Sequence, residues 1–401
     1  MQKRAAYHGL AVVTLLNFLN YIDRYILAAV LPRMQSELQL TNAQAGLLAT
    51  AFLLAYFITS PIFGALGDRL SRTRLMAVGV SAWSVATAAT GIMRSFAQLM
   101  MARSCVGVGE AAYATISPAL LSDYFPKSQR GRAFAVFYVA IPVGAAVGYL
   151  LGGLIEPRFG WRAAFYIVGF PGILMALLAL TIVDPPRGAM EDGVAAPPQR
   201  VGATLRAFVQ NFAYTGTVLG YAAYTFALGG LAYWMPGYLE KVRGVDLSQA
   251  NYIVGAVTVV AGLGGTFVGG YLGDFLSQRI KHGQLWLCGL SSAVAVVPTV
   301  LALTVGSAPA YIMWLFVAEF FLFLSTGPVN VVIVSVVPIA ARAMAMAVSI
   351  FAIHLLGDAI SPPIIGLLAD ISGLARAALI VPAAVGLAGI IWIATAIGSA
   401  D

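Results

Sequence analysis

Four ionisable residues lie within apolar stretches long enough to cross a bilayer: Asp23, Arg24, Arg103 and Glu110. A charge at the centre of a bilayer costs roughly 2.5–3.5 kcal/mol on insertion scales, so such residues are paired or face water. Seven residues are nearly two helical turns, so Arg103 and Glu110 share a face, whereas the adjacent Asp23 and Arg24 diverge by about 100°. Crossed pairs, Asp23 with Arg103 or Arg24 with Glu110, would neutralise all four.

These residue types favour the binding of an anion and the movement of a proton. A guanidinium matches phosphate oxygens bidentately, so Arg24 or Arg103 would bind an anionic headgroup. Asp23 and Glu110 would accept protons, because burial favours the neutral form of a carboxyl and a nearby arginine favours its charged form. We expect all four to line a central cavity. The alternative is that they only hold the first and fourth helices together.

Two further acidic positions follow the same logic. His354 and Asp358 are four residues apart, which places them on one helix face. The pair would carry protons or contact substrate, or would be a packing hydrogen bond. Glu319 is a lone acid in the aromatic run 316–323, where a cavity role and a position near interfacial water are equally compatible with the pattern.

Other chemistry has little support in the sequence. Cys105 and Cys288 lie in apolar stretches, so we expect neither a disulfide nor a metal site. No phosphate-binding Gly-x-x-x-x-Gly-Lys-Ser/Thr motif and no nucleophile constellation occurs, so we expect no enzyme and no cofactor. Several aromatic residues of one apolar stretch are candidates to line an acyl-chain path: Tyr221, Tyr224, Phe226, Tyr233 and Trp234, although interfacial positions explain the last two equally well.

The composition determines which elements position these residues. The 401-residue chain is 60% apolar and 10% charged, whereas soluble domains are roughly 25% charged. This composition indicates an all-α membrane protein and argues against nucleic-acid binders and disulfide scaffolds. Stretches with few charges predict twelve transmembrane helices near 7–30, 43–67, 75–93, 98–122, 132–155, 163–183, 209–236, 249–272, 285–306, 310–336, 343–368 and 377–398.

The basic residues indicate orientation. With both termini placed in the cytoplasm, the inner loops carry about twice as many Lys and Arg as the outer loops. The net charge of +7 is therefore a topology signal rather than a nucleic-acid patch. Lys3 and Arg4 precede an apolar stretch as in a signal peptide, but no small-residue cleavage site follows, so we expect a retained first helix.

The chain divides into two halves around a polar segment rich in Pro and Gly, residues 184–206. Six predicted helices precede it and six follow. Gly-x-Leu-Gly-Asp-x-Leu-Ser ends at Ser71 in the first half and recurs at Ser277 in the second. Such a repeat indicates two pseudo-symmetric six-helix bundles. We expect an N-terminal bundle at 1–183, a cytoplasmic linker at 184–206 and a C-terminal bundle at 207–401.

The twelve predicted helices, the central linker and the pattern Gly-x-x-x-Asp-Arg-x-x-Arg from Gly64 to Arg72 after the second helix resemble the major facilitator superfamily over the whole chain. Three segments also resemble its Spinster branch: Asn20-Tyr-Ile-Asp-Arg-Tyr25, Val106-Gly-Val-Gly-Glu110-Ala-Ala-Tyr113 continuing to Pro118, and Phe137-Tyr-Val-Ala-Ile-Pro-Val-Gly144. The branch resemblance implies export of lysophospholipids or sphingosine phosphate, often proton-linked. On this basis Tyr113, Tyr224 and His354 join Arg24 and Arg103 as candidate substrate-binding residues, and Asp358 joins the two proton acceptors.

The superfamily resemblance also implies a gate. Asp68 and Asp274 end helices at equivalent places of the two halves, and each would face a helix N-terminus of the other half. Arg69 and Arg72 would add ion pairs between the halves. Such contacts would close the inner side while the outer side is open. Ordinary helix caps are the alternative.

The sequence thus predicts a monomeric, multi-pass transporter of the bacterial inner membrane, with protons and an amphipathic anionic lipid as its partners. One alternative keeps the fold and changes the cargo to drugs or small organic anions. Another is a ligand sensor or passive lipid scramblase built on the same scaffold.

Overall fold

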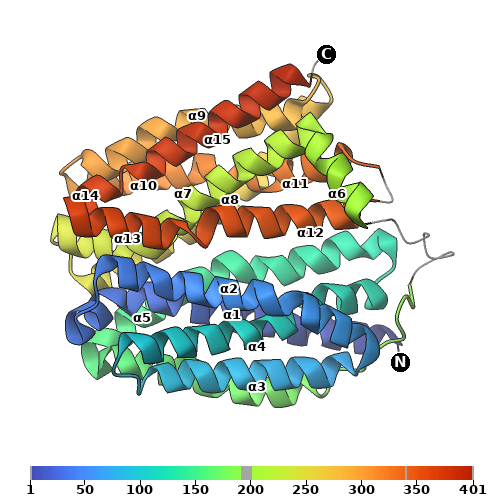
Figure 1. The fold of residues 1–401 in the computed structure, drawn as a ribbon, viewed down its shortest axis with the longest axis horizontal. Helices are drawn as coiled ribbons and strands as arrows, with labels where there is room; N and C mark the ends of the chain where they lie inside the picture. Colours follow the sequence, from blue (N-terminus) through green and yellow to red (C-terminus); the bar gives the residue numbers. More distant parts are fainter. Residues whose placement is uncertain (1, 191–200, 339–340, 400–401) are drawn as a thin grey trace. The chain divides into compact units, whose positions relative to one another are not determined.

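The computed structural model describes residues 2–190, 201–338 and 341–399, and most of these residues lie in helices (Figure 1). The first helices are α1 (Gln2–Leu38), α2 (Asn42–Arg69), α3 (Arg72–Thr90), α4 (Phe96–Tyr124), α5 (Lys127–Ala179) and α6 (Val201–Gln210). There follow α7 (Phe212–Arg243), α8 (Leu247–Ser277), α9 (Gly283–Thr304), α10 (Ala308–Phe323) and α11 (Thr326–Ser335). The last are α12 (Arg342–Ile353), the π-helix η2 (His354–Asp358), α13 (Ser361–Ser372), α14 (Leu374–Ala377) and α15 (Ile380–Gly398).

Eight helical stretches among the described residues are long and apolar enough to cross a membrane. One of them, Gln129–Ala179, contains two spans, because Gly160 (φ 76°, ψ 165°) interrupts its helical geometry. A positive φ of this kind is accessible to glycine without strain. The less apolar α3, α4 and α7 bring the spans of the described residues to twelve. The predicted all-helical fold is thereby confirmed.

Some predicted spans consist of more than one helical segment. The span expected at 310–336 is α10 followed by α11, and the span expected at 343–368 is α12, η2 and α13. Pro362 and Pro363 lie in the first turn of α13, where a missing N–H leaves no intrahelical bond unmade. Prolines in this position explain why the span restarts at Ser361 rather than continuing as one α-helix.

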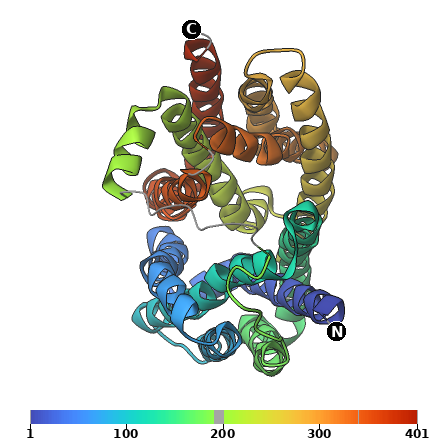
Figure 2. The same cartoon turned by 90° about the vertical axis from the view of Figure 1, so that its right-hand side faces the viewer.

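Two compact units result: Met1–Val194 with Gly244–Gly255, and Ala195–Arg243 with Ala256–Asp401. Figure 2 shows the helices from one end. Residues 244–255 were expected in the second bundle, but they belong to the first unit by their contacts. Asn251 Nδ2 donates to the carbonyl of Ala29 at 3.0 Å, and the Ser248 hydroxyl donates to the carbonyl of Gly153.

Within the first unit, α4 packs closely against α2 and α3 because glycines face its neighbours. Gly107 of α4 lies directly against the carbonyl of Phe52 on α2. A Cβ at Gly79 of α3 would approach the Cβ of Ala112 to 2.5 Å. Glycine at such crossings allows the helix backbones to approach. This packing fixes the rotation of α4 and therefore the direction in which Arg103 and Glu110 point.

Within the second unit, α7 packs against α15 and η2. Trp392 of α15 is fully buried, and its indole Nε1 donates to the carbonyl of Thr217 at 3.0 Å. A Cβ at Gly220 would lie 2.5 Å from this indole nitrogen. Glycine at position 220 thus makes room for the fully buried indole of Trp392.

Candidate functional site

Arg24 of α1 and Glu110 of α4 form an ion pair in the first unit. Both Nε and Nη2 of Arg24 lie 2.9 Å from Oε2 of the carboxylate. One of the two crossed pairs expected from the sequence is therefore present. A charge-assisted contact through two N–H groups is stronger and more directional than a single neutral hydrogen bond.

Asp23 points toward α3 instead. The Thr87 hydroxyl donates to its Oδ2 at 2.5 Å, and the aspartate is fully buried. Arg103 of α4 is the arginine expected to pair with Asp23, and its charge acts on this carboxyl. No ion pair within 4.0 Å joins these two residues in the part of the chain that the structure describes. The second expected pair, Asp23 with Arg103, is therefore not formed as a direct ion pair in this structure.

Arg103 keeps unused hydrogen-bonding capacity. Its side chain is buried, and its Nε and Nη1 make no hydrogen bond to any described residue. The guanidinium carbon lies 5.0 Å from the centre of the Phe52 ring, and the guanidinium carbon of Arg24 lies 4.9 Å from the same ring. An aromatic face stabilises a cation by about 0.5–2 kcal/mol. Phe52 therefore lies against both arginines.

Access to this cluster is uneven. The side chain of Arg24 is 20% exposed, whereas Asp23, Arg103 and Glu110 are at most 3% exposed. Only Arg24 of these four therefore reaches the surface of the first unit, and the expectation that all four line a central cavity stays a prediction. The other three are buried among the helices of the first unit.

Tyr113 and Tyr224, both expected to contact substrate, use their hydroxyls in helix packing. Tyr113 donates to the carbonyl of Val13 on α1 at 2.8 Å, and Tyr224 donates to the carbonyl of Leu322 on α10 at 3.0 Å. Both side chains are buried. A substrate would have to displace these backbone bonds, so the geometry favours a structural role for both tyrosines.

His354 and Asp358 form the local pair that their spacing predicts. Nδ1 of the imidazole lies 2.9 Å from each carboxylate oxygen, and both side chains are partly exposed. The pair spans the single π-turn η2, a feature frequent at functional sites. Gly229 of α7 packs against it, since a Cβ there would lie 2.5 Å from the Cβ of Asp358.

Glu319 of α10 is a buried carboxyl in the second unit. It is 4% exposed, and its Oε2 makes no hydrogen bond to any described residue. The interfacial position considered from the sequence would require more exposure than this. Glu319 is therefore a buried acid among helices rather than a residue that reaches surface water.

The candidate gating residues occupy two kinds of environment. Asp68 and Arg69 are exposed at the end of α2, and Asp274 is exposed near the end of α8. Asp274 lines a cavity of about 580 Å³ in the second unit, together with the segment 277–285. Arg72 differs from these three because it is buried.

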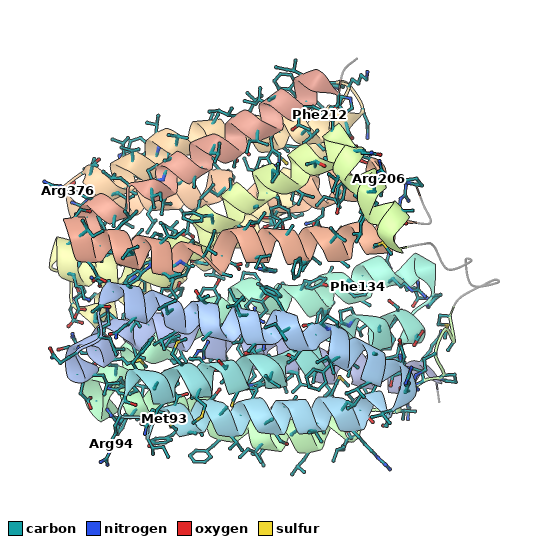
Figure 3. The ribbon with its side chains drawn as sticks, viewed as in Figure 1. Met93, Arg94, Phe134, Arg206, Phe212 and Arg376 are labelled. Carbon is teal, nitrogen blue, oxygen red and sulfur yellow. The ribbon has the colours of Figure 1, made fainter. Side chains whose placement is uncertain are left out.

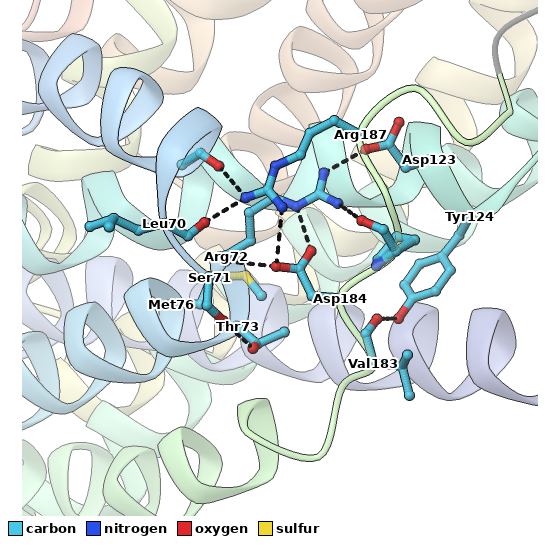
Figure 4. Close-up of polar contacts among 12 residues, drawn as sticks. Leu70, Ser71, Arg72, Thr73, Met76, Asp123, Tyr124, Val183, Asp184 and Arg187 are labelled. Carbon is cyan, nitrogen blue, oxygen red and sulfur yellow. Dashed lines mark hydrogen bonds and ion pairs between the residues drawn. The ribbon is translucent and has the colours of Figure 1, made fainter.

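Arg72 is bonded entirely within the first unit (Figure 4). Its Nη1 donates to Asp123 Oδ2 at 2.6 Å, its Nε to Asp184 Oδ1 at 2.7 Å, and its Nη2 to the Pro185 carbonyl at 2.6 Å. The expectation that Arg72 pairs with the other half is therefore wrong. The physical reason is that the segment after α5 returns to the α2–α3 loop. There Asp184 and Pro185 accept hydrogen bonds from the guanidinium N–H groups.

The same segment is held at a second point. Nη2 of Arg187 donates to the carbonyl of Gly67 at 2.8 Å, and the backbone N–H of Gly188 donates to Asp123 Oδ1 at 2.9 Å. The Arg187 bond uses a carbonyl at the end of α2 that the helix itself leaves unpaired. The first residues of the expected linker thus belong structurally to the first unit.

Comparison with known proteins identifies the family of this arrangement. The family model described as "Major Facilitator Superfamily" matches residues 13–357. Protein spinster homolog 3 of Danio rerio is 34% identical over 391 residues, which is 92% of this chain and 78% of the relative. Protein spinster homolog 1 of Homo sapiens is 35% identical over 385 residues, covering 90% and 72%. The chain belongs to the Spinster family of the major facilitator superfamily.

Other Spinster relatives extend this result. The sphingosine-1-phosphate transporter SPNS2 of Danio rerio is 32% identical over 374 residues, covering 88% of this chain and 74% of the relative. The fold matches a crystal structure of a bacterial homologue of the human lysosomal transporter Spinster, in an inward-facing and unoccupied conformation. That match has a TM-score of 0.89 at 23% identity and covers 98% of this chain and 97% of the other. The resemblance noted in the sequence is confirmed.

As a Spinster-family member the protein is a multi-pass membrane transporter, not an enzyme. Sequence reasoning missed several residues of its charged cluster, among them Phe52 and Thr87. An aromatic ring in an apolar span and a threonine in a small-residue helix carry no individual signal. Both become recognisable once the helices are packed.

Proposed function

We propose that the protein moves an amphipathic anionic lipid, of the lysophospholipid or sphingosine-phosphate type, across the membrane and couples this movement to that of a proton. The observation that carries this proposal is the Arg24–Glu110 pair, in which a partly exposed guanidinium is neutralised by a fully buried carboxylate. A solute that reaches Arg24 competes with Glu110 for the same N–H groups.

The headgroup chemistry follows from the donors present. Arg24 presents two N–H groups in the direction of Glu110, and two nitrogens of Arg103, Nε and Nη1, have no hydrogen-bond partner among the described residues. A phosphate has enough oxygens to accept from both guanidinium groups. The relative named as a sphingosine-1-phosphate transporter supports this substrate class.

Charge balance gives the proton its role. When a phosphate monoanion takes the place of the Glu110 carboxylate at Arg24, the carboxylate is left buried and uncompensated. A buried charge without a partner is strongly unfavourable, so Glu110 binds a proton at this step. Headgroup and proton then enter together and the net charge of the cluster is unchanged. Asp23, held by Thr87 and close to Arg103, offers a second acceptor.

The proposal extends to the second unit through His354 and Asp358. Their partly exposed pair can donate to a headgroup or pass a proton. We also propose that the bundles predicted at 1–183 and 207–401 alternate in the side to which they open, with Asp68, Arg69 and Asp274 in the gate.

The test uses the purified chain in proteoliposomes with an imposed pH gradient. We expect flux of a lysophospholipid and of sphingosine 1-phosphate that depends on the gradient, and little flux of glycerol phosphate or of a cationic drug. Glu110→Gln and Asp23→Asn should retain binding and lose the dependence on the gradient. Arg94→Gln, an exposed change in the same unit, is the matched control.

Four outcomes would contradict the proposal. Lipid flux that ignores the gradient in the unsubstituted protein would indicate a scramblase, and binding without flux would indicate a sensor. Transport of glycerol phosphate or of the drug in preference to lipid would show that the substrate is not an amphipathic anionic lipid. Unaltered pH-driven flux in both carboxylate variants would remove the assigned proton acceptors.

A further inference from the structure

A cavity of about 580 Å³ lies in the second unit, where α8 ends and α9 begins. Its walls are Asp274 of α8, the segment 277–285, and part of the segment 331–336 at the end of α11. The Asn211 side chain, directly before α7, donates to the carbonyl of Val336 in this wall at 2.8 Å. Small-molecule sites typically have volumes of roughly 300–1,000 Å³, so the chemistry of the walls decides what the cavity can hold.

The first turn of α9 carries backbone N–H groups without a partner. The helix begins at Gly283, and no side chain caps it. The N–H groups of Gly283 and Trp286 donate to carbonyls of the preceding turn. The two N–H groups between them, of Gln284 and Leu285, make no hydrogen bond to any described residue. Both residues are buried, and buried backbone N–H groups without a partner are rare in native proteins.

His282 explains why no side chain fills this position. It precedes the helix in a left-handed conformation, with φ 57° and ψ 29°. Nε2 of its imidazole lies 2.8 Å from the carbonyl oxygen of Ser399, after the end of α15. The side chain next to the first turn is thus engaged with α15, and the N–H groups of α9 stay available at the cavity wall.

The Gln284 side chain is a second unpartnered group at the same wall. It is 8% exposed, and its amide makes no hydrogen bond within the part of the chain that the structure describes. Gly273 of α8 leaves room for it, since a Cβ there would collide with Oε1. A carboxamide offers one acceptor and two donors, and leaving such a group buried without a partner is unfavourable. A ligand in the cavity would supply the missing partners.

The charges of the lining favour an anion. Arg279 and Lys281 bring two cations to the walls, against the one carboxylate of Asp274. The guanidinium carbon of Arg279 lies 4.0 Å from the centre of the Phe275 ring, and this arginine has no ion pair with a described carboxylate. The N-terminus of α9 adds partial positive charge on the same side. Unpaired N–H groups at such a terminus are typical of phosphate sites.

We propose that this cavity binds a phosphate group, carried either by a small solute or by a lipid headgroup. The N–H groups of Gln284 and Leu285 and the guanidinium of Arg279 donate to the phosphate oxygens. The Gln284 amide bonds to the phosphate or to a hydroxyl of the same ligand. Apart from Asp274, none of the lining residues takes part in the function proposed above, so this inference does not depend on it.

Hydrogen–deuterium exchange tests the site locally, because an unpaired N–H group exchanges quickly until a ligand protects it. The purified full chain in detergent is measured with glycerol phosphate, or with phosphatidylglycerol added to the micelle. Glycerol and potassium chloride at matched ionic strength are the controls. We expect a phosphate probe to slow exchange at the start of α9 several-fold, and the controls to have no effect. Protection by glycerol phosphate assigns a soluble source, and protection by phosphatidylglycerol alone assigns a headgroup.

Substitutions in the lining should change this protection in opposite directions. Arg279→Gln and Gln284→Met should raise the probe concentration for half protection several-fold, whereas Asp274→Asn should lower it by removing a repulsive charge. A gain of affinity is not expected if these residues only hold the helices together. Arg376→Gln is the matched control, and Figure 3 shows Arg376 at the end of the second unit opposite Phe212, where α7 begins.

Three results would overturn the inference. Exchange that neither phosphate probe slows would show that the cavity holds only water. Equal protection by potassium chloride would reduce the site to a general effect of ionic strength. Protection that is unchanged in both Arg279→Gln and Gln284→Met, with unfolding midpoints showing that these variants are folded, would place the phosphate outside this cavity.

Discussion

Arg24 and Glu110 are 86 positions apart in the sequence, and two nitrogens of the arginine lie 2.9 Å from one oxygen of the glutamate. The glutamate is fully buried and the arginine side chain is 20% exposed. The pair therefore joins the interior of the first unit to its surface. Any change at Arg24 acts directly on a carboxylate that has no access to water.

Removing one partner of this pair should destabilise the protein more than removing both. Breaking a buried ion pair costs about 3–5 kcal/mol, because the remaining charge is left uncompensated. We expect Arg24→Gln to lower the midpoint of thermal unfolding in detergent, and Arg24→Gln with Glu110→Gln to recover much of that loss. Additive losses in this double-mutant cycle would mean that the two residues are not energetically coupled.

The hydroxyl of Thr87 should contribute to the stability of the first unit through Asp23. A hydrogen bond to a charged group is worth about 1.5–3 kcal/mol, and valine has nearly the shape of threonine. Thr87→Val should therefore lower the free energy of unfolding by that amount. Thr90→Val is the matched control, since Thr90 only bonds the Ala86 carbonyl of its own helix. Equal effects of the two substitutions would argue against the Asp23 contact.

The cluster around Arg72 should depend on guanidinium geometry and not only on charge. Three acceptors surround Arg72, and an ammonium cannot reproduce its planar fork. We expect Arg72→Lys to reduce stability and to expose the segment after α5 to proteolysis. Arg187→Gln changes a side chain that is 43% exposed, and its ion pair should contribute less than about 1 kcal/mol. A larger loss of stability in Arg187→Gln than in Arg72→Lys would contradict the conclusion that Arg72 is the more important residue of this cluster.

The approach of α7 to η2 should tolerate no side chain at Gly229. A Cβ there would lie 2.5 Å from the Cβ of Asp358, and overpacking of this kind costs about 1–3 kcal/mol. Gly229→Ala should lower the unfolding midpoint and disturb the His354–Asp358 pair. Gly270→Ala, in α8 with no atom within 4 Å of its Cβ position, should be neutral or stabilising. Comparable unfolding midpoints for both variants would show that α7 can move away from η2 at little cost in stability.

The sequence by itself determined the features that depend only on residues close to one another along the chain. Long apolar stretches predict helical spans, because a backbone inside lipid must satisfy its hydrogen bonds within the segment. The Gly-x-Leu-Gly-Asp repeat and the three branch motifs indicated the family that the comparisons confirm. The His354–Asp358 pair was predictable for the same reason, since four residues on one helix fix the geometry of their side chains.

Only the tertiary structure decided which residues meet across helices. Spacing predicted that Asp23 and Arg24 diverge, but the choice of Thr87 and Glu110 as their partners depends on the rotation and axial position of α3 and α4. That rotation is set by close contacts such as Gly107 against Phe52. The partners of Arg72, the backbone bonds of Tyr113 and Tyr224, and the cavity at the start of α9 have the same origin. Each of them requires the relative placement of separate helices, which no spacing along the chain contains.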